Sequence, residues 1–521
     1  MKSFPHKLSF LKNPLLFGTL LLTGTGILVR IIGFFYRIYL SRTIGAEGMG
    51  LYQLIFPAYN VCYALCCSSV QTAVSRFVAV ESAKGSSGQS KNYLTAGMFL
   101  SLLVSLSLTV GLYQGSAFVA SRLLLEPRCE PLLPILALAL PFNAIHACAY
   151  GYYYGRKKAE VPALSQLFEQ IVRVLVVVAL CENSRIQGGA PTVAFAVTGL
   201  VLGEIAALLF SLVCLARLLS AEKHTAKADS SVLSSFPGLF SHAGQLLKLY
   251  LPLCANRLTI NLLQSMEAVL IPGSLQLFGL GSSEALSLYG VFTGMSLPFI
   301  LFPTAVTNSL AVMLLPAIAE AGERGDLEKI SRTTGMTIRY CLYIGILFTG
   351  IFFCFGPDMG QIIFGNAEAG RFISILAWLC PFLYLSGTVS SILNGLGKAG
   401  NVFLHSLGGL SLRLAFVVFG IPRFGITAYL YGTLAGELLI TALHVTCFCK
   451  DFPLAFRAGY TLIRPMAACV LCRFLIGALA KKTAGTIFGI PFFTLAAHCA
   501  LFAAAYLLIL FLTKNSELEA R

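Results

Sequence analysis

Charged residues are scarce in this chain of 521 residues, where Asp, Glu, Lys and Arg together make up only 11%. Hydrophobic residues make up 57% of it, and the mean hydropathy is +0.81. An ordinary soluble domain carries about 25% charged residues, so this composition excludes one. The sequence therefore predicts a polytopic membrane protein made only of helices.

Acidic residues are rarest inside the apolar segments. All four aspartates are predicted to lie in loops, at Asp229, Asp326, Asp358 and Asp451. The chain also lacks a Walker motif, an HExxH motif and a DxD-like acidic pair. We therefore expect no enzyme activity, no cofactor, no metal site and no ATP-driven step within this chain.

Two further absences narrow the class of protein. No cleavable signal peptide is evident, because the first apolar run is too long for one and follows Lys2, Lys7 and Lys12. The net charge of +15 is not gathered into a basic run of a soluble domain, so we expect no nucleic-acid partner. The sixteen cysteines are scattered through apolar segments and are interpreted as small packing residues.

What the sequence does contain is a series of long apolar segments. Hydropathy and helix-breaking residues predict about fourteen membrane spans. We place them near residues 15–42, 51–80, 93–121, 131–155, 160–182, 191–217, 247–273, 285–317, 332–356, 370–396, 400–421, 425–449, 458–480 and 489–513.

The loop charges predict how these spans are oriented. Lys and Arg gather in alternate loops, as in Arg156-Lys157-Lys158, whereas loops 43–50 and 274–284 contain neither. Positive loops face the cytoplasm, and an even number of spans puts both termini on one side. We expect a multi-pass protein of the bacterial cytoplasmic membrane with both termini in the cytoplasm.

An internal repeat divides the chain into two similar halves. Residues of several types recur at a constant offset of 240: Ile135 with Ile375, Pro141 with Pro381, Gly155 with Gly395, Lys158 with Lys398 and Arg173 with Arg413. Gly199, Gly203 and Glu204 recur at a slightly shorter offset as Gly432, Gly436 and Glu437. The repeat predicts two pseudo-symmetric lobes of six helices each, related as a parallel duplication.

The predicted domains follow from this duplication. We expect an N-terminal lobe at residues 1–217, a cytoplasmic linker at 218–246, a C-terminal lobe at 247–450, and two further helices with a cytoplasmic tail at 451–521. Two such lobes rocking about a central cavity would give alternating access, which is the architecture of a transporter.

The first span carries arginines that an anchoring helix would not need. Gly26, Arg30, Gly33 and Arg37 share one helical face, which must adjoin protein or water. An arginine near the bilayer centre costs roughly 2.5–3.5 kcal/mol on insertion scales. One interpretation is that each arginine pairs with a buried glutamate and only locks helices together.

The other interpretation is a binding site for an anionic substrate. Arg30, Arg37 and Arg257 lie in the first helix of each lobe, where guanidinium groups could bind a pyrophosphate. Glu267 and Arg339 are also predicted to be buried. The other buried charges are predicted to be structural clamps, because an arginine on one helix matches a glutamate on the next in each lobe, or the two pair within one helix: Glu169, Arg173, Glu204, Arg413 and Glu437.

Several segments resemble a known family. GTLLLTGTGILVRIIGFFYRIYLSRTIGAEGMGLYQLIFP, SRFVAVESAKG and NGLGKAGNVFLHSLGGLSLRL are similar to signatures of the stage V sporulation protein B and polysaccharide-flippase group. The resemblance implies the multidrug/oligosaccharidyl-lipid/polysaccharide exporter superfamily and translocation of undecaprenyl-pyrophosphate-linked sugars, such as lipid II. It also implies a cavity arginine in the first helix, which Arg30 matches.

These observations predict a flippase for a lipid-linked oligosaccharide of the cell wall, the spore cortex or another polysaccharide. We expect it to contact membrane lipid and to act as a monomer, with Na⁺, H⁺ or the membrane potential as the alternatives for its driving force. One alternative is a cation-coupled multidrug exporter of the same superfamily, against which the lack of intramembrane aspartate argues. Another is a membrane scaffold for envelope assembly that transports nothing.

Overall fold

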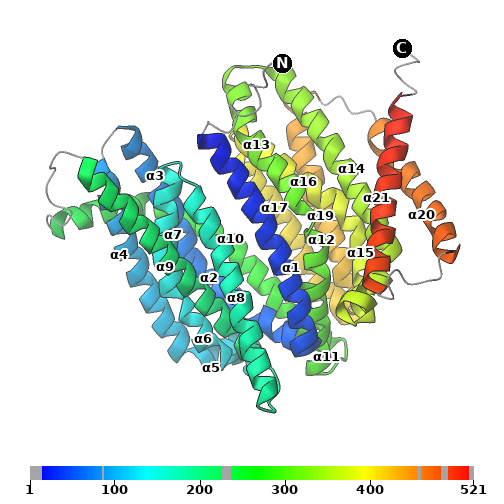
Figure 1. Cartoon of the computed structure of the whole chain (residues 1–521), viewed down its shortest axis with the longest axis horizontal. Helices are drawn as coiled ribbons and strands as arrows, with labels where there is room; N and C mark the ends of the chain where they lie inside the picture. The colour runs from blue at the N-terminus through cyan, green and yellow to red at the C-terminus, as the bar shows by residue number, and fades with distance from the viewer. Residues whose placement is uncertain (1–13, 85–86, 226–235, 454–458, 483–490, 516–521) are drawn as a thin grey trace, which may run out of the picture. The chain divides into compact units, whose positions relative to one another are not determined.

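The computed structural model describes residues 14–84, 87–225, 236–453, 459–482 and 491–515 (Figure 1). All regular elements within these ranges are helical, which confirms the predicted all-α class. Eleven helices there are long and apolar enough to cross a membrane. The longest of these stretches, Gly24–Ala83, has 60 residues and is long enough for two crossings. The total of fourteen spans stays a prediction.

The contacts divide the chain into two compact units, residues 1–269 and 270–521. The boundary lies inside one helix, α10 (Phe236–Leu277), whose earlier part packs on the first unit. The predicted division at 218–246 stays a prediction. Residues 226–235 of that linker, with Asp229, lie outside the described residues, as do Lys2, Lys7 and Lys12.

Within the described residues, the first unit contains ten α-helices with short π and 3₁₀ segments between some of them. In chain order they are α1 (Pro14–Leu54), α2 (Phe56–Tyr63), α3 (Ser69–Ala83), α4 (Ser87–Gln114), α5 (Ser116–Phe118), α6 (Leu132–Ala137), α7 (Ala139–Gly155), α8 (Glu160–Ile186), α9 (Val193–Thr225) and the larger part of α10. The helices α3, α4 and α7 lie side by side around buried Tyr152 and Tyr153 (Figure 1).

In the part of the second unit that the structure describes, the rest of α10 is followed by eleven further α-helices. They are α11 (Ser282–Gly290), α12 (Leu297–Leu301), α13 (Thr304–Glu323), α14 (Leu327–Met359), α15 (Ala367–Leu376), α16 (Cys380–Gly395), α17 (Ala399–Ala415), α18 (Ile421–Phe424), α19 (Ile426–Cys449), α20 (Arg464–Lys482) and α21 (Pro491–Asn515). The last two pack on α14 and on each other (Figure 1).

Proline and glycine set many of the helix breaks. Pro57, Pro298 and Pro381 stand in the first turn of α2, α12 and α16, where the missing N–H of proline leaves no helical hydrogen bond unmade. Gly45 interrupts α1 with φ 71° and ψ −178°, a conformation that only glycine adopts readily. This kink follows the predicted end of the first span.

The duplication is visible in the hydrogen bonds. Thr109 Oγ1 donates to the carbonyl of Ala137 at 3.1 Å, and Thr349 Oγ1 donates to that of Ala377 at 3.0 Å. Thr349 and Ala377 stand 240 residues after Thr109 and Ala137, so the second hydrogen bond is the repeat equivalent of the first. Helices α7 and α16 also end at equivalent positions, Gly155 and Gly395. The two units therefore share backbone architecture as well as sequence.

Two predicted placements are wrong. Asp358, expected in a loop, lies in the last turn of α14, because that helix continues to Met359. Arg339, expected among the buried charges, is exposed on the same helix. The helix has one strongly apolar face, and Arg339 lies away from the buried Ile338 and Cys341.

Candidate functional site

The face of α1 that carries glycine and arginine lies against α8. A Cβ atom added to Gly33 would meet Gln170 Nε2 of α8 at 3.3 Å, so the two helices approach closely there. On the reverse face, Leu28 and Phe35 are 48% and 56% exposed. The small-residue face therefore adjoins protein at Gly33, whereas a Cβ atom on Gly26 would meet nothing within 4 Å, and large apolar side chains cover the outer face.

Arg37 and Arg30 are both half-buried on this face of α1. Arg37 lies within electrostatic reach of Tyr52 and of Arg173 on α8. In the described part of the chain, no carboxylate lies within ion-pair distance of Arg37. The structure therefore brings a predicted substrate arginine next to a predicted clamp arginine.

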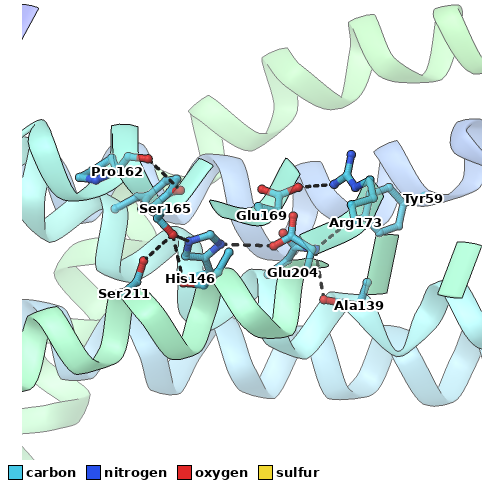
Figure 2. Close-up of polar contacts among 12 residues, drawn as sticks. Tyr59, Ala139, His146, Pro162, Ser165, Glu169, Arg173, Glu204 and Ser211 are labelled. Carbon is cyan, nitrogen blue, oxygen red and sulfur yellow. Dashed lines mark hydrogen bonds and ion pairs between the residues drawn. The ribbon is translucent and has the colours of Figure 1, made fainter. Parts of the chain in front are cut away.

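Arg173 is held by residues of its own helix (Figure 2). Its Nη2 forms an ion pair with Glu169, four residues earlier, and its Nη1 donates to Gln170 Oε1 at 3.5 Å. This i, i+4 order of glutamate and arginine is the favoured one on a helix. The intrahelical pair expected from the sequence is present.

Glu204 of α9 joins this pair to a histidine. Its Oε2 lies 3.3 Å from His146 Nδ1 on α7. Figure 2 shows the Glu169 and Glu204 side chains pointing toward each other. The cluster therefore joins α7, α8 and α9 through polar side chains.

The other side of His146 is satisfied by serine. Its Nε2 lies 3.2 Å from Ser165 Oγ on α8, and Ser211 Oγ of α9 donates to Ser165 Oγ at 3.0 Å. The Ser165 hydroxyl also lies 3.0 Å from the carbonyl of Ala207. His146, Ser165 and Ser211 are all buried, and their partners come from three helices (Figure 2).

Glycine lets α8 and α9 come close enough to form this network. A Cβ atom on Gly203 would lie 3.1 Å from the Glu169 carbonyl and 3.2 Å from Arg173 Cβ. The equivalent glycine of the second unit, Gly436, faces Arg413 in the same way, at 2.5 Å from its Cγ. The repeated small residues thus mark the same helix contact in each unit.

Two arginines meet where α1 packs on α8. Arg37 of α1 lies within electrostatic reach of Arg173 of α8, and Arg173 is ion-paired with Glu169. Because burial weakens the screening by water, a second arginine beside this ion pair favours a negatively charged ligand.

Arg257 of α10 occupies a different part of the first unit. It is half-buried, and its Nη2 donates to Thr72 Oγ1 of α3 at 2.9 Å. The described residues offer it no carboxylate at ion-pair distance. Nearby on α10, Asn261 Nδ2 donates to the carbonyl of Asn60 at 3.2 Å. Arg257 thus lies against α3, whereas Arg37 lies against α8.

The second unit arranges its predicted clamps differently. Glu437 of α19 accepts a hydrogen bond from Ser386 of α16, and Arg413 Nη2 donates to Tyr429 Oη at 3.3 Å. Glu437 is buried, and Arg413 is half-buried. The roles predicted for these residues, and for the three substrate arginines, stay predictions.

The sequence analysis missed His146 and the serines bound to it. A lone histidine in an apolar span is usually a packed core residue, so it carried no signal by itself. The repeat does offer a signal, because the residue 240 positions after His146 is Ser386. The hydroxyl of Ser386 donates to Glu437, which is the equivalent of Glu204. Only a comparison of the two halves, position by position, would have singled it out.

Comparisons with known proteins agree with this architecture. A model of the polysaccharide biosynthesis protein family matches residues 15–320. Stage V sporulation protein B of Bacillus subtilis (strain 168) is 30% identical over 518 residues, which cover 98% of each protein. A solved structure of the lipid II flippase MurJ in an inward closed conformation has a TM-score of 0.73 at 13% identity, covering 96% of this chain and 100% of that chain.

A second solved structure has a similar fold. An outward-facing multidrug resistance MATE family transporter of the MOP superfamily has a TM-score of 0.60 at 13% identity, covering 86% of this chain and 98% of that chain. The chain therefore has the multi-pass helical fold of these membrane proteins. It belongs to the polysaccharide biosynthesis protein family. The resemblance found in the sequence is confirmed.

Proposed function

We propose that this protein moves an undecaprenyl-pyrophosphate-linked saccharide across the bacterial cytoplasmic membrane. The cargo would be a lipid II-like precursor of the cell wall or spore cortex, or a polysaccharide unit. The family and the likeness to a relative named for sporulation support this cargo class. A solved neighbour is named as a lipid II flippase, and its likeness supports the fold.

The proposal rests on two half-buried arginines that have no acidic partner among the described residues. Arg37 and Arg257 are half-buried in apolar helices, and neither has a carboxylate within ion-pair distance in the described part of the chain. A guanidinium stays charged when desolvated and binds phosphate oxygens in a bidentate manner. A pyrophosphate would supply the missing negative charge.

The duplication supports a transport cycle for this binding group. In our proposal the two related units expose the arginines alternately to the two sides of the membrane. The bound pyrophosphate crosses with its saccharide while the lipid tail stays in contact with membrane lipid. A Na⁺ or H⁺ gradient would set the direction, and one protein molecule would suffice for the cycle.

The test is a flipping assay with purified protein in liposomes that contain a defined lipid II. We expect flipping by the wild-type protein and a loss of about 10- to 100-fold in Arg37→Ala or Arg257→Ala, the size of one lost charged hydrogen bond. Arg→Lys should restore part of the rate, because an ammonium keeps the charge but not the planar fork. Arg→Glu should be worse than Arg→Ala.

An exposed arginine provides the matched control. Arg324 is 70% exposed and pairs with Glu320 at 2.6 Å, so Arg324→Ala should flip lipid II at the wild-type rate. Full activity of a well-expressed Arg30→Ala, Arg37→Ala double variant would end the anionic-site proposal. Extrusion of an ethidium-like cation with no lipid II flipping would favour the drug-exporter alternative.

A further inference from the structure

The buried polar cluster of the first unit has an equivalent in the second unit with histidine and serine exchanged. The offsets of the repeat place Ser386 at the position of His146, and His405 at the position of Ser165. By the offset that relates Glu204 to Glu437, His444 stands at the position of Ser211. The first unit has one histidine and two serines around its glutamate, and the second has one serine and two histidines.

The two clusters differ in how well their hydrogen-bonding groups are paired. Every hydrogen-bonding group of His146, Ser165 and Ser211 has a partner. In the second unit, both ring nitrogens of His444 and Nδ1 of His405 are buried and form no well-aligned hydrogen bond with the described residues, although backbone groups of Val402 and Ser386 lie close to His444. His444 is only 2% exposed. Poorly paired buried groups of this kind cost free energy, and a role beyond packing would account for them.

The two imidazoles lie in contact. Their ring centroids are 5.1 Å apart, His405 on α17 and His444 on α19, near the ends of these helices that lead to Lys398 and Lys450. An imidazole differs from a serine hydroxyl in that it binds a proton reversibly near neutral pH. Two adjacent rings can share one added proton, with one ring as donor and the other as acceptor.

The charged and titratable groups around the pair are already engaged or carry positive charge. On α19, Glu437 accepts a hydrogen bond from Ser386, and Cys447 accepts one from Asn401 at 3.5 Å. Lys450, directly after α19, lies within electrostatic reach of His405. Lys398, directly before α17, is ion-paired with Asp451, and Arg413 of α17 donates to Tyr429. The facing helix α16 contributes the neutral Ser386. No carboxylate in the described residues bonds either imidazole.

We propose that His405 and His444 form a proton-binding site that couples a proton gradient to movement of the cargo. One proton from water binds a ring nitrogen lone pair, is shared between the two rings, and leaves unchanged on the other side of the membrane. The packed arrangement offers it no counter-charge, so the protonated pair favours an arrangement in which the rings reach water. The coupling rests on the proposed function, whereas the proton binding does not.

The proton binding can be tested without any cargo. The full-length protein, purified in detergent with its seven histidines ¹⁵N-labelled, would be titrated by NMR, and His405→Ser and His444→Ser would assign the signals. We expect the two rings to titrate together as the pH is lowered, and His444→Ser to remove this coupled behaviour. His444→Gln serves if the serine variant does not fold. Rings that stay neutral throughout, or that titrate independently, would overturn the site.

The coupling needs a second measurement, in liposomes with a defined lipid II and an imposed pH gradient. We expect the gradient to accelerate flipping by the wild-type protein, and the double variant His405→Ser, His444→Ser to lose this acceleration. The matched control is His498→Ser, whose ring stacks on Phe355 in the same unit and which should keep it. Flipping that ignores the gradient in the wild type refutes the coupling and leaves the flippase proposal intact. A wild type that titrates but moves no lipid II refutes the flippase proposal alone.

Discussion

At the scale of single residues, the arginines differ in what holds them. Arg173 is tied to Glu169 within α8, whereas Arg37 and Arg257 have hydroxyl groups or another arginine nearby. Removing Arg173 leaves a buried carboxylate unpaired, whereas removing Arg37 or Arg257 leaves no carboxylate of the described residues unpaired. The same substitution should therefore damage the fold in one case and the binding of cargo in the others.

Arg173→Ala should destabilise the protein by about 3–5 kcal/mol, because Glu169 loses its partner in a site where both side chains are largely buried. The measurement is the yield in membranes and the midpoint of heat-induced aggregation in detergent. Arg185→Ala is the matched control, because Arg185 pairs with Glu182 at 2.6 Å on the same helix with both side chains about half exposed. It should cost less than about 1 kcal/mol. Normal stability of Arg173→Ala with lost flipping would instead place Arg173 in the substrate site.

At the scale of helices, hydropathy and breakers account for much of the fold. The long apolar runs reappear as helices, and Pro57, Pro298 and Pro381 begin new ones as their lack of an N–H predicts. The sequence could not predict which helices pack together, because an apolar run does not indicate which neighbouring helix it will contact. For this reason the contact of α10 with α2 and α3, and the bonding of Glu204 to His146 rather than to Arg173, were found only in the structure.

Adjacent glycines on α17 allow a sharp test of helix packing. A Cβ atom on Gly409 would lie 2.9 Å from the Gly436 carbonyl of α19, whereas one on Gly408 would meet nothing within 4 Å. Gly409→Ala should push the helices apart and cost about 1–3 kcal/mol. Gly408→Ala should change stability by no more than about 0.5 kcal/mol. Denaturation midpoints in detergent would compare them, and equal midpoints would contradict the close contact of α17 with α19.

At the scale of the whole molecule, the fold resembles that of solved membrane transporters, the chain belongs to the polysaccharide biosynthesis protein family, and the loop charges predict its orientation. Alkaline phosphatase fused after Leu280, in a loop without Lys or Arg, should be active because that loop is predicted to face outward. The same reporter fused after Ser220 should be inactive. A green fluorescent protein at each site should give the opposite pattern. Activity after Ser220 would overturn the orientation and, with it, the cytoplasmic placement of both termini.

The kink of α1 lies close to an ion pair that ties this helix to a later part of the first unit. Two residues after Gly45, Glu47 accepts from Arg128 at 2.5 Å, and Arg128 also bonds the buried Glu126 at 2.8 Å. The hydrogen bond to Glu126, with the one to Glu47, raises the pKa of Arg128, so the tie keeps its charge at any physiological pH. If the orientation is as predicted, this tie lies on the outer surface. A soluble crosslinker that joined positions 47 and 128 from outside the cell would then hold α1 in one arrangement. It would stop the transport cycle without entering the membrane.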